Sequence, residues 1–187
     1  MKKFFKNYSY QSVVLFVIQI AISLFGLMLA LAAGLAKNEA LKIVTGVFSA
    51  LFFLFLQYGS AWRVGAEDRI SIDVGKKKLN LLIPVGLWLL SNSINLLLAI
   101  FVNLGLLFPN VSFFSSLGGI CASAYLLIEG VYVALLSIDV GGFPLNSYGI
   151  MFFVTTLPSF IVIFFGYWLG VKNATLFKMF LTSKPKR

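Results

Sequence analysis

WRVGAEDRISIDVGKKK, residues 62–78, is the one substantial polar stretch between the apolar segments, and it decides how the rest of the chain is arranged. It carries eight charged residues, and the sequence on both sides is almost unbrokenly apolar. Short basic loops of membrane proteins stay in the cytoplasm. The stretch therefore predicts a cytoplasmic connector between two membrane spans. Its five basic residues should set the topology and face the lipid headgroups: Arg63, Arg69, Lys76, Lys77 and Lys78.

The composition lies outside the range of soluble globular domains. Of the 187 residues, 60% are hydrophobic and 11% are charged, and the mean hydropathy is +0.97. No polar stretch is long enough to bury a core of its own. We therefore predict an all-α, polytopic transmembrane helix bundle, a single domain over residues 1–187 without a soluble domain.

Basic residues outnumber acidic ones by 15 to six. In a soluble protein such an excess would suggest nucleic acid as a partner. Here the basic residues stand at the ends of apolar segments, where each attracts anionic lipid by ~1 kcal/mol. We expect the lipid bilayer as the partner and no nucleic acid.

Hydropathy divides the chain into five segments, each long enough to cross a ~30 Å hydrocarbon core. The first is too long for the h-region of a signal peptide, ~7–15 residues, so we expect it to be retained as a span. After the last segment, apolar residues fall on one side of a predicted interfacial helix within residues 173–187. The five predicted spans cover about residues 10–36, 43–62, 79–108, 112–137 and 148–171.

The distribution of positive charge conflicts with an odd number of spans. With five spans and a cytoplasmic N-terminus, eight Lys and Arg residues lie inside and seven outside, whereas six spans give 13 and two. A clear inside excess is the usual pattern. Residues 79–137 could hold three short crossings, or residues 112–138 could be re-entrant. We adopt the five spans that hydropathy supports and keep six as the alternative.

Two spans carry small and polar residues at helical spacing, which lets helices approach closely in lipid. On the first span the predicted packing face contains Gln19, Ser23, Gly26, Ala30 and Ala33 or Gly34. On the second it contains Gly46, Ala50, Phe53, Gln57 and Ala61. Further on, the alternating residues 70–74 are compatible with a short extended piece or an irregular loop.

Glu129 is the only acidic residue well inside an apolar segment. A charge at mid-membrane costs ~2.5–3.5 kcal/mol on insertion scales, so such residues usually face the bundle interior. We predict that Glu129 faces Asn92 and Asn95, and that it is largely protonated at neutral pH. The alternative is a purely structural residue, or one wetted near the interface. The full candidate polar site is Glu129, Asn92, Asn95, Asn103, Gln57 and Gln19.

Catalytic and cofactor motifs are missing from the sequence. Without histidine, His-ligated metal sites and Ser–His catalysis are excluded, and the single Cys121 forms no internal disulfide. Neither GxGD nor the P-loop pattern occurs, and Asp68, Asp73 and Asp139 are predicted to lie in loops. We expect no enzyme, no cofactor and no metal.

Two short motifs resemble a group of small, uncharacterised multi-span membrane proteins of Gram-positive bacteria. One is Glu67-Asp68-Arg69 with the following Val74-Gly75-Lys76, and the other is the ending Gly166-Tyr167-Trp168-Leu169-Gly170-Val171-Lys172. The resemblance implies a bacterial cytoplasmic membrane and no particular activity. It also implies a cytoplasmic Lys172, which would favour an even number of spans.

Two functions are compatible with these features. The first is a small transporter or the membrane subunit of a transporter, in which Glu129 and the asparagines line a cavity. The second is a non-catalytic accessory or scaffold protein that packs against another membrane protein or a second copy of itself.

Overall fold

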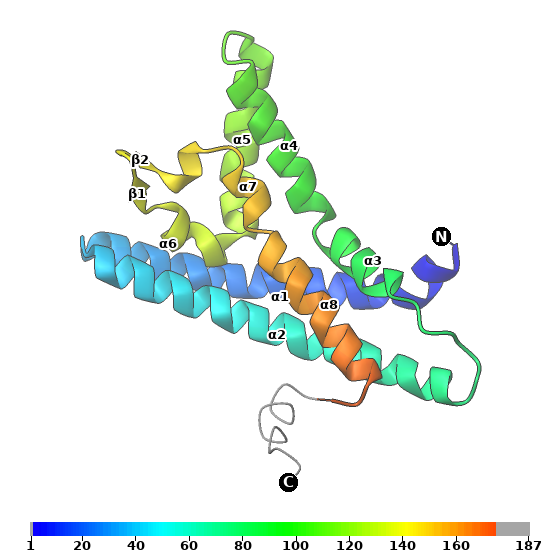
Figure 1. Ribbon diagram of the computed structural model, residues 1–187. Helices are drawn as coiled ribbons and strands as arrows, with labels where there is room; N and C mark the ends of the chain where they lie inside the picture. The colour runs from blue at the N-terminus through cyan, green and yellow to red at the C-terminus, as the bar shows by residue number, and fades with distance from the viewer. Residues whose placement is uncertain (1, 175–187) are drawn as a thin grey trace.

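A computed structural model describes residues 2–174, and the side chains from residue 4 onward, as a predominantly helical bundle (Figure 1). Apolar runs form helices because every backbone polar group in lipid must be satisfied internally. Two long helices, α1 (Lys2–Leu35) and α2 (Glu39–Asp73), form a hairpin. Asn38 caps α2 through a hydrogen bond from the Leu41 amide. The predicted all-α architecture is confirmed.

Shorter elements complete the bundle. A two-stranded antiparallel hairpin, with Val140 opposite Phe143, turns at two glycines of positive φ. The predicted tail helix, apart from its first two residues, lies outside the described residues. The remaining elements are α3 (Leu82–Ser91), α4 (Ser93–Leu107), α5 (Ser112–Ile128), η1 (Gly130–Tyr132), α6 (Val133–Leu136), β1 (Asp139–Val140), β2 (Phe143–Pro144), η2 (Leu145–Ser147), α7 (Met151–Val154) and α8 (Leu157–Val171).

Three described helices are long and apolar enough to cross a membrane, namely Phe4–Leu35, Glu39–Asp73 and Met151–Val171. Two further helix pairs pass the same criterion but are sharply bent. The α3–α4 pair bends by 60°, and the pair formed by α5 and Gly130–Leu136 bends by 85°. Residues 2–174 thus contain three candidate spans, or five if each bent pair is one span.

Helix α8 runs beside α2 in the same direction. Ser159, near the start of α8, donates a hydrogen bond to Gln57, whereas Gly170, near its end, packs against the backbone of Trp62. The Trp62 indole donates to the Ala174 carbonyl at 2.8 Å. The C-terminal ends of α2 and α8 therefore lie together with the start of α1, at what we call the basic end. The opposite end, at the α1–α2 turn, is the distal end.

Small residues allow these close approaches, as the sequence predicts. A Cβ atom on Gly26 would lie 2.6 Å from the Val131 Cα, and one on Gly65 would collide with the Tyr167 carbonyl. The predicted inward face of α2 is buried throughout. On α1, Gln19, Ser23, Gly26 and Ala33 are buried, while Ala30 is half-buried and Gly34 is exposed.

The charged stretch is helical, contrary to the predicted connector. Helix α2 continues to Asp73, so neither alternative for residues 70–74, the short extended piece or the irregular loop, is correct. The connector is reduced to residues 74–81. Ion pairs spaced four residues apart line the helix, with Arg69 Nε 3.2 Å from Asp73 Oδ2. The charges of these ion pairs therefore lie along the outside of the helix, which ends just before Gly75, where φ is 72°.

Candidate functional site

Three helical segments are interrupted where buried polar side chains meet. The interruptions fall at Asn92 between α3 and α4, at Glu129 between α5 and η1, and at Thr155 and Thr156 between α7 and α8. Helices α1 and α2 pass beside them with buried glutamines. We call this polar cluster the hub; it consists of Gln19, Gln57, Ser91, Asn92, Asn95, Glu129, Tyr132 and Ser159, all buried.

A chain of hydrogen bonds runs through the hub. The Asn95 amide donates to Glu129 Oε1 at 2.8 Å and to Asn92 Oδ1 at 3.3 Å. The Asn92 amide reaches Ser159 Oγ at 3.5 Å, and Ser159 donates to Gln57 Oε1 at 2.6 Å. The predicted contact of Glu129 with the asparagines is thus present, and the chain extends through α8 to α2.

Serine hydroxyl groups donate hydrogen bonds to backbone carbonyls around the break at Glu129. The Ser23 hydroxyl donates to the Ile128 carbonyl, and the Ser49 hydroxyl donates to the Val131 carbonyl at 2.8 Å. Gly130 lets the broken segment lie against α1, because a Cβ atom there would collide with the Ser23 carbonyl. Irregular backbone at membrane depth is tolerated where protein buries it and supplies such partners.

Asparagine and proline account for the other two interruptions. The Asn92 side chain donates to the Trp88 carbonyl at 3.1 Å, and this carbonyl also accepts a hydrogen bond from the Asn92 backbone amide at 2.9 Å. At the α7–α8 break, Pro158 lies at the start of α8, where a proline is tolerated. The Trp88 indole donates to the Thr156 carbonyl at 3.1 Å, which ties this break to α3.

Several buried polar atoms of the hub have no hydrogen-bond partner among the described residues. Leaving such a group unsatisfied costs ~1–3 kcal/mol, so their concentration in one place needs an explanation. The Gln19 side chain lies beside the Glu129 carboxyl. The unpartnered atoms are Gln19 Oε1 and Nε2, Gln57 Nε2, Asn95 Oδ1, Glu129 Oε2 and the Tyr132 hydroxyl.

Asn103, which the sequence analysis grouped with the hub residues, has other partners. Its amide donates to the Ala99 carbonyl at 2.8 Å and to the Gly149 carbonyl at 3.0 Å. The second of these bonds joins α4 to the turn before α7. Asn103 is therefore placed as a packing residue, two turns of helix away from Asn95.

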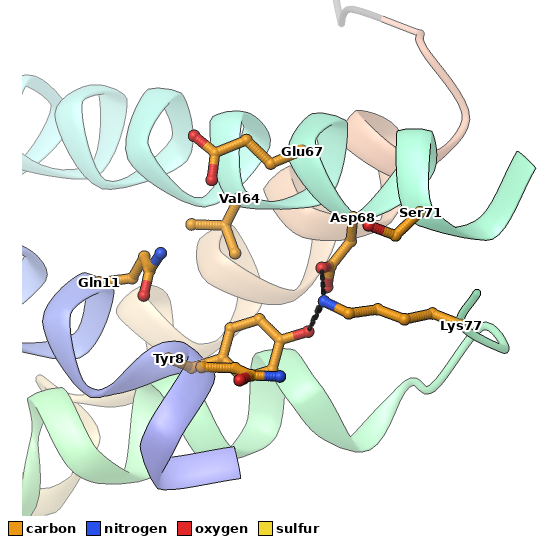
Figure 2. A pocket seen from close by; sticks show the side chains of 8 residues that line it. Tyr8, Gln11, Val64, Glu67, Asp68, Ser71 and Lys77 are labelled. Carbon is orange, nitrogen blue, oxygen red and sulfur yellow. Dashed lines mark hydrogen bonds and ion pairs between the residues drawn. The ribbon is translucent and has the colours of Figure 1, made fainter. Parts of the chain in front are cut away.

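A second buried cluster lies at the basic end and was missed in the sequence (Figure 2). Asp68 is only 5% exposed. Its carboxylate accepts hydrogen bonds from the Tyr8 hydroxyl at 2.5 Å and the Tyr167 hydroxyl at 2.9 Å, and Lys77 Nζ lies 2.6 Å away. The assignment of Asp68 to a loop was wrong because α2 does not end before it. The spacing of Gln57, Ala61, Val64 and Asp68 along one helical face could have revealed this.

The basic residues of the stretch divide accordingly. Lys77, predicted to face the lipid headgroups, points instead into the bundle towards Asp68 (Figure 2). Lys76 and Lys78 are exposed in the connector. The side chains of Arg63 and Arg69 are 63% and 37% exposed on the outside of α2.

A pocket of about 340 Å³ opens beside the basic-end cluster (Figure 2). It lies between α1, α2 and the connector. Gln11 Oε1 is buried at its wall and has no partner among the described residues. The lining residues are Asn7, Tyr8, Gln11, Val64, Glu67, Asp68, Ser71 and Lys77.

An apolar layer separates this pocket from the hub. On α1, buried Leu15 lies between Gln11 and Gln19, which are ~12 Å apart along the helix. On α8, buried Ile163 lies between Ser159 and Tyr167. On α2 and α3 the buried residues at this level are Ala61, Val64, Ile83 and Leu87, and they pack with Leu15 and Ile163 in one cluster.

No group of three or more His, Cys, Asp or Glu side chains that could hold a metal ion occurs in residues 2–174. Comparison of the chain with protein families, with curated proteins and with solved structures yields no match. The functional argument therefore starts from the geometry of the hub and of the basic end.

Proposed function

We propose that the protein is a small membrane transporter, or the membrane subunit of one, with the hub as its polar binding site. The observation that carries this proposal is the interruption of three helical segments around one buried carboxyl group. Transporters build substrate and ion sites from discontinuous helices near the middle of the bilayer. A buried intramembrane carboxyl group marks such pathways by default.

The basic-end pocket gives this site a route to water. The pocket, the apolar layer that contains Leu15, and the hub follow one another along α1. We infer that the pocket is a vestibule and that the apolar layer is a closed gate. Moving α8 relative to α1 would open it, because the two helices supply Ile163 and Leu15 of this layer.

The direction of α8 supports an even number of traverses. The ends of α2 and α8 lie together, so a cytoplasmic connector implies a cytoplasmic Lys172. Between them, α3 starts near Phe4 at the basic end, and α6 brings Leu135 against Gly46 near the distal end. Segments α3 to α6 together then cross the membrane once, because the α4–α5 hairpin leaves the bundle and returns to it. This arrangement restores 13 basic residues inside and two outside, in a bacterial cytoplasmic membrane.

The accessory role stays a second candidate because of the α4–α5 hairpin. The hairpin leaves the bundle at a steep angle (Figure 1). Its surface bears large apolar side chains that another membrane protein or a second copy could cover. They include Leu97, Ile100, Leu106, Leu107, Phe113 and Ile120.

Access of water to the hub separates the two roles without knowledge of a substrate. In a Cys121→Ala background, Ser91→Cys places a thiol in the hub with little change in volume. We expect a small cationic thiol reagent to label this variant in membrane vesicles. Ala99→Cys, buried in the α4–α5 core, should stay unlabelled and serves as the control. If Ser91→Cys does not react in the folded protein, the transporter proposal is contradicted and the accessory role is favoured.

A further inference from the structure

We propose that the basic-end pocket binds a primary ammonium group, which takes the place of Lys77 at the Asp68 carboxylate. The inference goes beyond the proposed function, because it concerns the pocket itself and holds whether or not water reaches the hub. The geometry that points to it is a buried carboxylate at the wall of a cavity of about 340 Å³, with a side-chain ammonium group already seated on it.

The two carboxylate oxygens of Asp68 have different partners. The hydroxyls of Tyr8 and Tyr167 both donate to Oδ2, at 2.5 and 2.9 Å. Oδ1 accepts a hydrogen bond from Lys77 Nζ at 2.6 Å. The same nitrogen lies 3.3 Å from the Tyr8 hydroxyl oxygen and 5.2 Å from the centre of the Tyr8 ring, which is a cation–π distance. The position in front of Oδ1 therefore offers an ammonium group a charged acceptor, a hydroxyl oxygen and an aromatic face.

Lys77 is free to leave this position, whereas Asp68 is not. The Lys77 side chain is 35% exposed and belongs to the connector, but the Asp68 side chain is 6% exposed on α2. A buried carboxylate without a cation is costly, so the departure of Lys77 requires a replacement. In Figure 2, Lys77 approaches from the connector, while Gln11 and Glu67 lie on the other side of Tyr8 and Asp68. A ligand in the pocket thus approaches the carboxylate from a side that Lys77 does not occupy.

The charge of the pocket selects a cation. Its lining contains two carboxylates, Glu67 and Asp68, and one ammonium group, that of Lys77. An anion would meet this negative excess, whereas exchange of one ammonium group for another leaves the charge of the pocket unchanged. A hard metal ion needs several free oxygens, but Oδ2 of Asp68 already accepts two hydroxyl donors. Val64 and the Tyr8 ring supply an apolar wall for an alkyl chain.

Binding of radiolabelled n-butylammonium tests the proposal, because a lysine side chain carries its ammonium group on the same four-carbon stem. The purified full chain in phosphatidylcholine nanodiscs should bind about one probe molecule saturably. Butan-1-ol, which has no charge, should not compete. Lys77→Ala removes the internal competitor and should tighten binding about tenfold or more, because a larger fraction of the sites is then open to the ligand.

Variants of two acidic residues on α2 locate the site. Asp68→Asn should abolish binding of the probe. Asp73→Asn, which alters an exposed carboxylate on the same helix, should bind as the unaltered protein does. Circular dichroism would verify that each variant is folded.

A spin label on the connector reports the departure of Lys77 independently. In a Cys121→Ala background, a nitroxide on Lys76→Cys occupies an exposed position beside Lys77. Its mobility in electron paramagnetic resonance spectra should rise with n-butylammonium and saturate at the concentrations that saturate binding. With Lys77→Ala added, the label should be mobile from the start and should not respond to the probe.

The primary ammonium group could belong to a soluble amine or to the aminoethyl headgroup of a lipid. Phosphatidylcholine carries only a quaternary ammonium group, so nanodiscs that contain phosphatidylethanolamine distinguish the two sources. Weaker binding of the probe in those nanodiscs would assign the site to the lipid headgroup. Equal binding would assign it to a soluble amine.

Two results would overturn the ammonium site. One is binding of the probe to Lys77→Ala but not to the unaltered protein, or to neither, because the pair of Asp68 and Lys77 is then purely structural. The other is binding that survives Asp68→Asn in the folded protein. Labelling of Ser91→Cys reports on the hub alone, so failure of the ammonium site and failure of the proposed function are distinguishable.

Discussion

The Asn95 amide nitrogen donates a hydrogen bond to Glu129 Oε1 at 2.8 Å in the interior of the bundle, although the two residues are 34 positions apart in the chain. The contact joins α4 to the break that ends α5. It places a carboxyl group and an amide, both costly in lipid, where each satisfies the other. The hydrogen-bonded chain that continues to Gln57 makes this pair the centre of the structure rather than an isolated contact.

Removing the Glu129 carboxyl group should affect stability according to what replaces it. Glu129→Gln keeps an acceptor for the Asn95 amide and should leave the unfolding midpoint nearly unchanged. Glu129→Leu leaves that donor without its partner and should lower the unfolding free energy by ~0.6–2 kcal/mol. Thermal unfolding in detergent measures both. Equal stability of the two variants would contradict the predicted role of this hydrogen bond.

The α2–α8 contact should be intolerant of side chains at its glycines. Gly65→Leu would drive a side chain into the backbone of Tyr167, so we expect loss of folded protein in the membrane. Gly59→Leu on the same helix is the matched control, because a Cβ atom at Gly59 would point into open space. Comparable membrane levels of the two variants would show that the helices do not pack as described.

Asp68 should hold the connector against the bundle. Asp68→Ala removes the partner of Lys77 and of two tyrosine hydroxyls. Trypsin should therefore cleave the connector faster in inside-out vesicles of this variant. Asp73→Asn, which alters an exposed carboxylate on the same helix, should be cleaved at the original rate. Unchanged cleavage of Asp68→Ala would mean that the ion pair does not restrain the connector.

An even number of membrane crossings predicts that the connector and the end of α8 lie on the same side of the membrane. In a Cys121→Ala background, Lys76→Cys and Asn173→Cys should both resist an impermeant thiol reagent in intact cells and react after lysis. Lys37→Cys at the distal end should react in intact cells. Labelling of Asn173→Cys from outside would restore an odd number of spans.

Much of the packing was predictable from residue spacing. The buried face of α2 and the contact of Glu129 with Asn95 follow from the cost of exposing small and polar groups to lipid. To predict the direction in which Glu129 faces, only that cost and the period of the helix were needed. These predictions needed no knowledge of tertiary structure.

The helix breaks and the burial of Asp68 were not predictable in the same way. Hydropathy averages over a window, so a break at Asn92 or Glu129 inside an apolar run leaves no signal. Charged residues favoured a loop around Asp68, whereas pairs such as Arg69 and Asp73 stabilise a helix. What buries Asp68 are hydroxyls from Tyr8 and Tyr167, 60 and 99 residues away in the chain.

Infrared spectroscopy of the Glu129 carboxyl group tests the central claim most directly, because it reports whether the hub exchanges with water. In the folded protein at neutral pH we predict a carbonyl band from a protonated carboxylic acid that is absent in Glu129→Gln. The band should shift after transfer to D₂O. A band assigned to Glu129 that stays unshifted in D₂O, while the protein remains folded, would show a permanently dry hub and contradict the account.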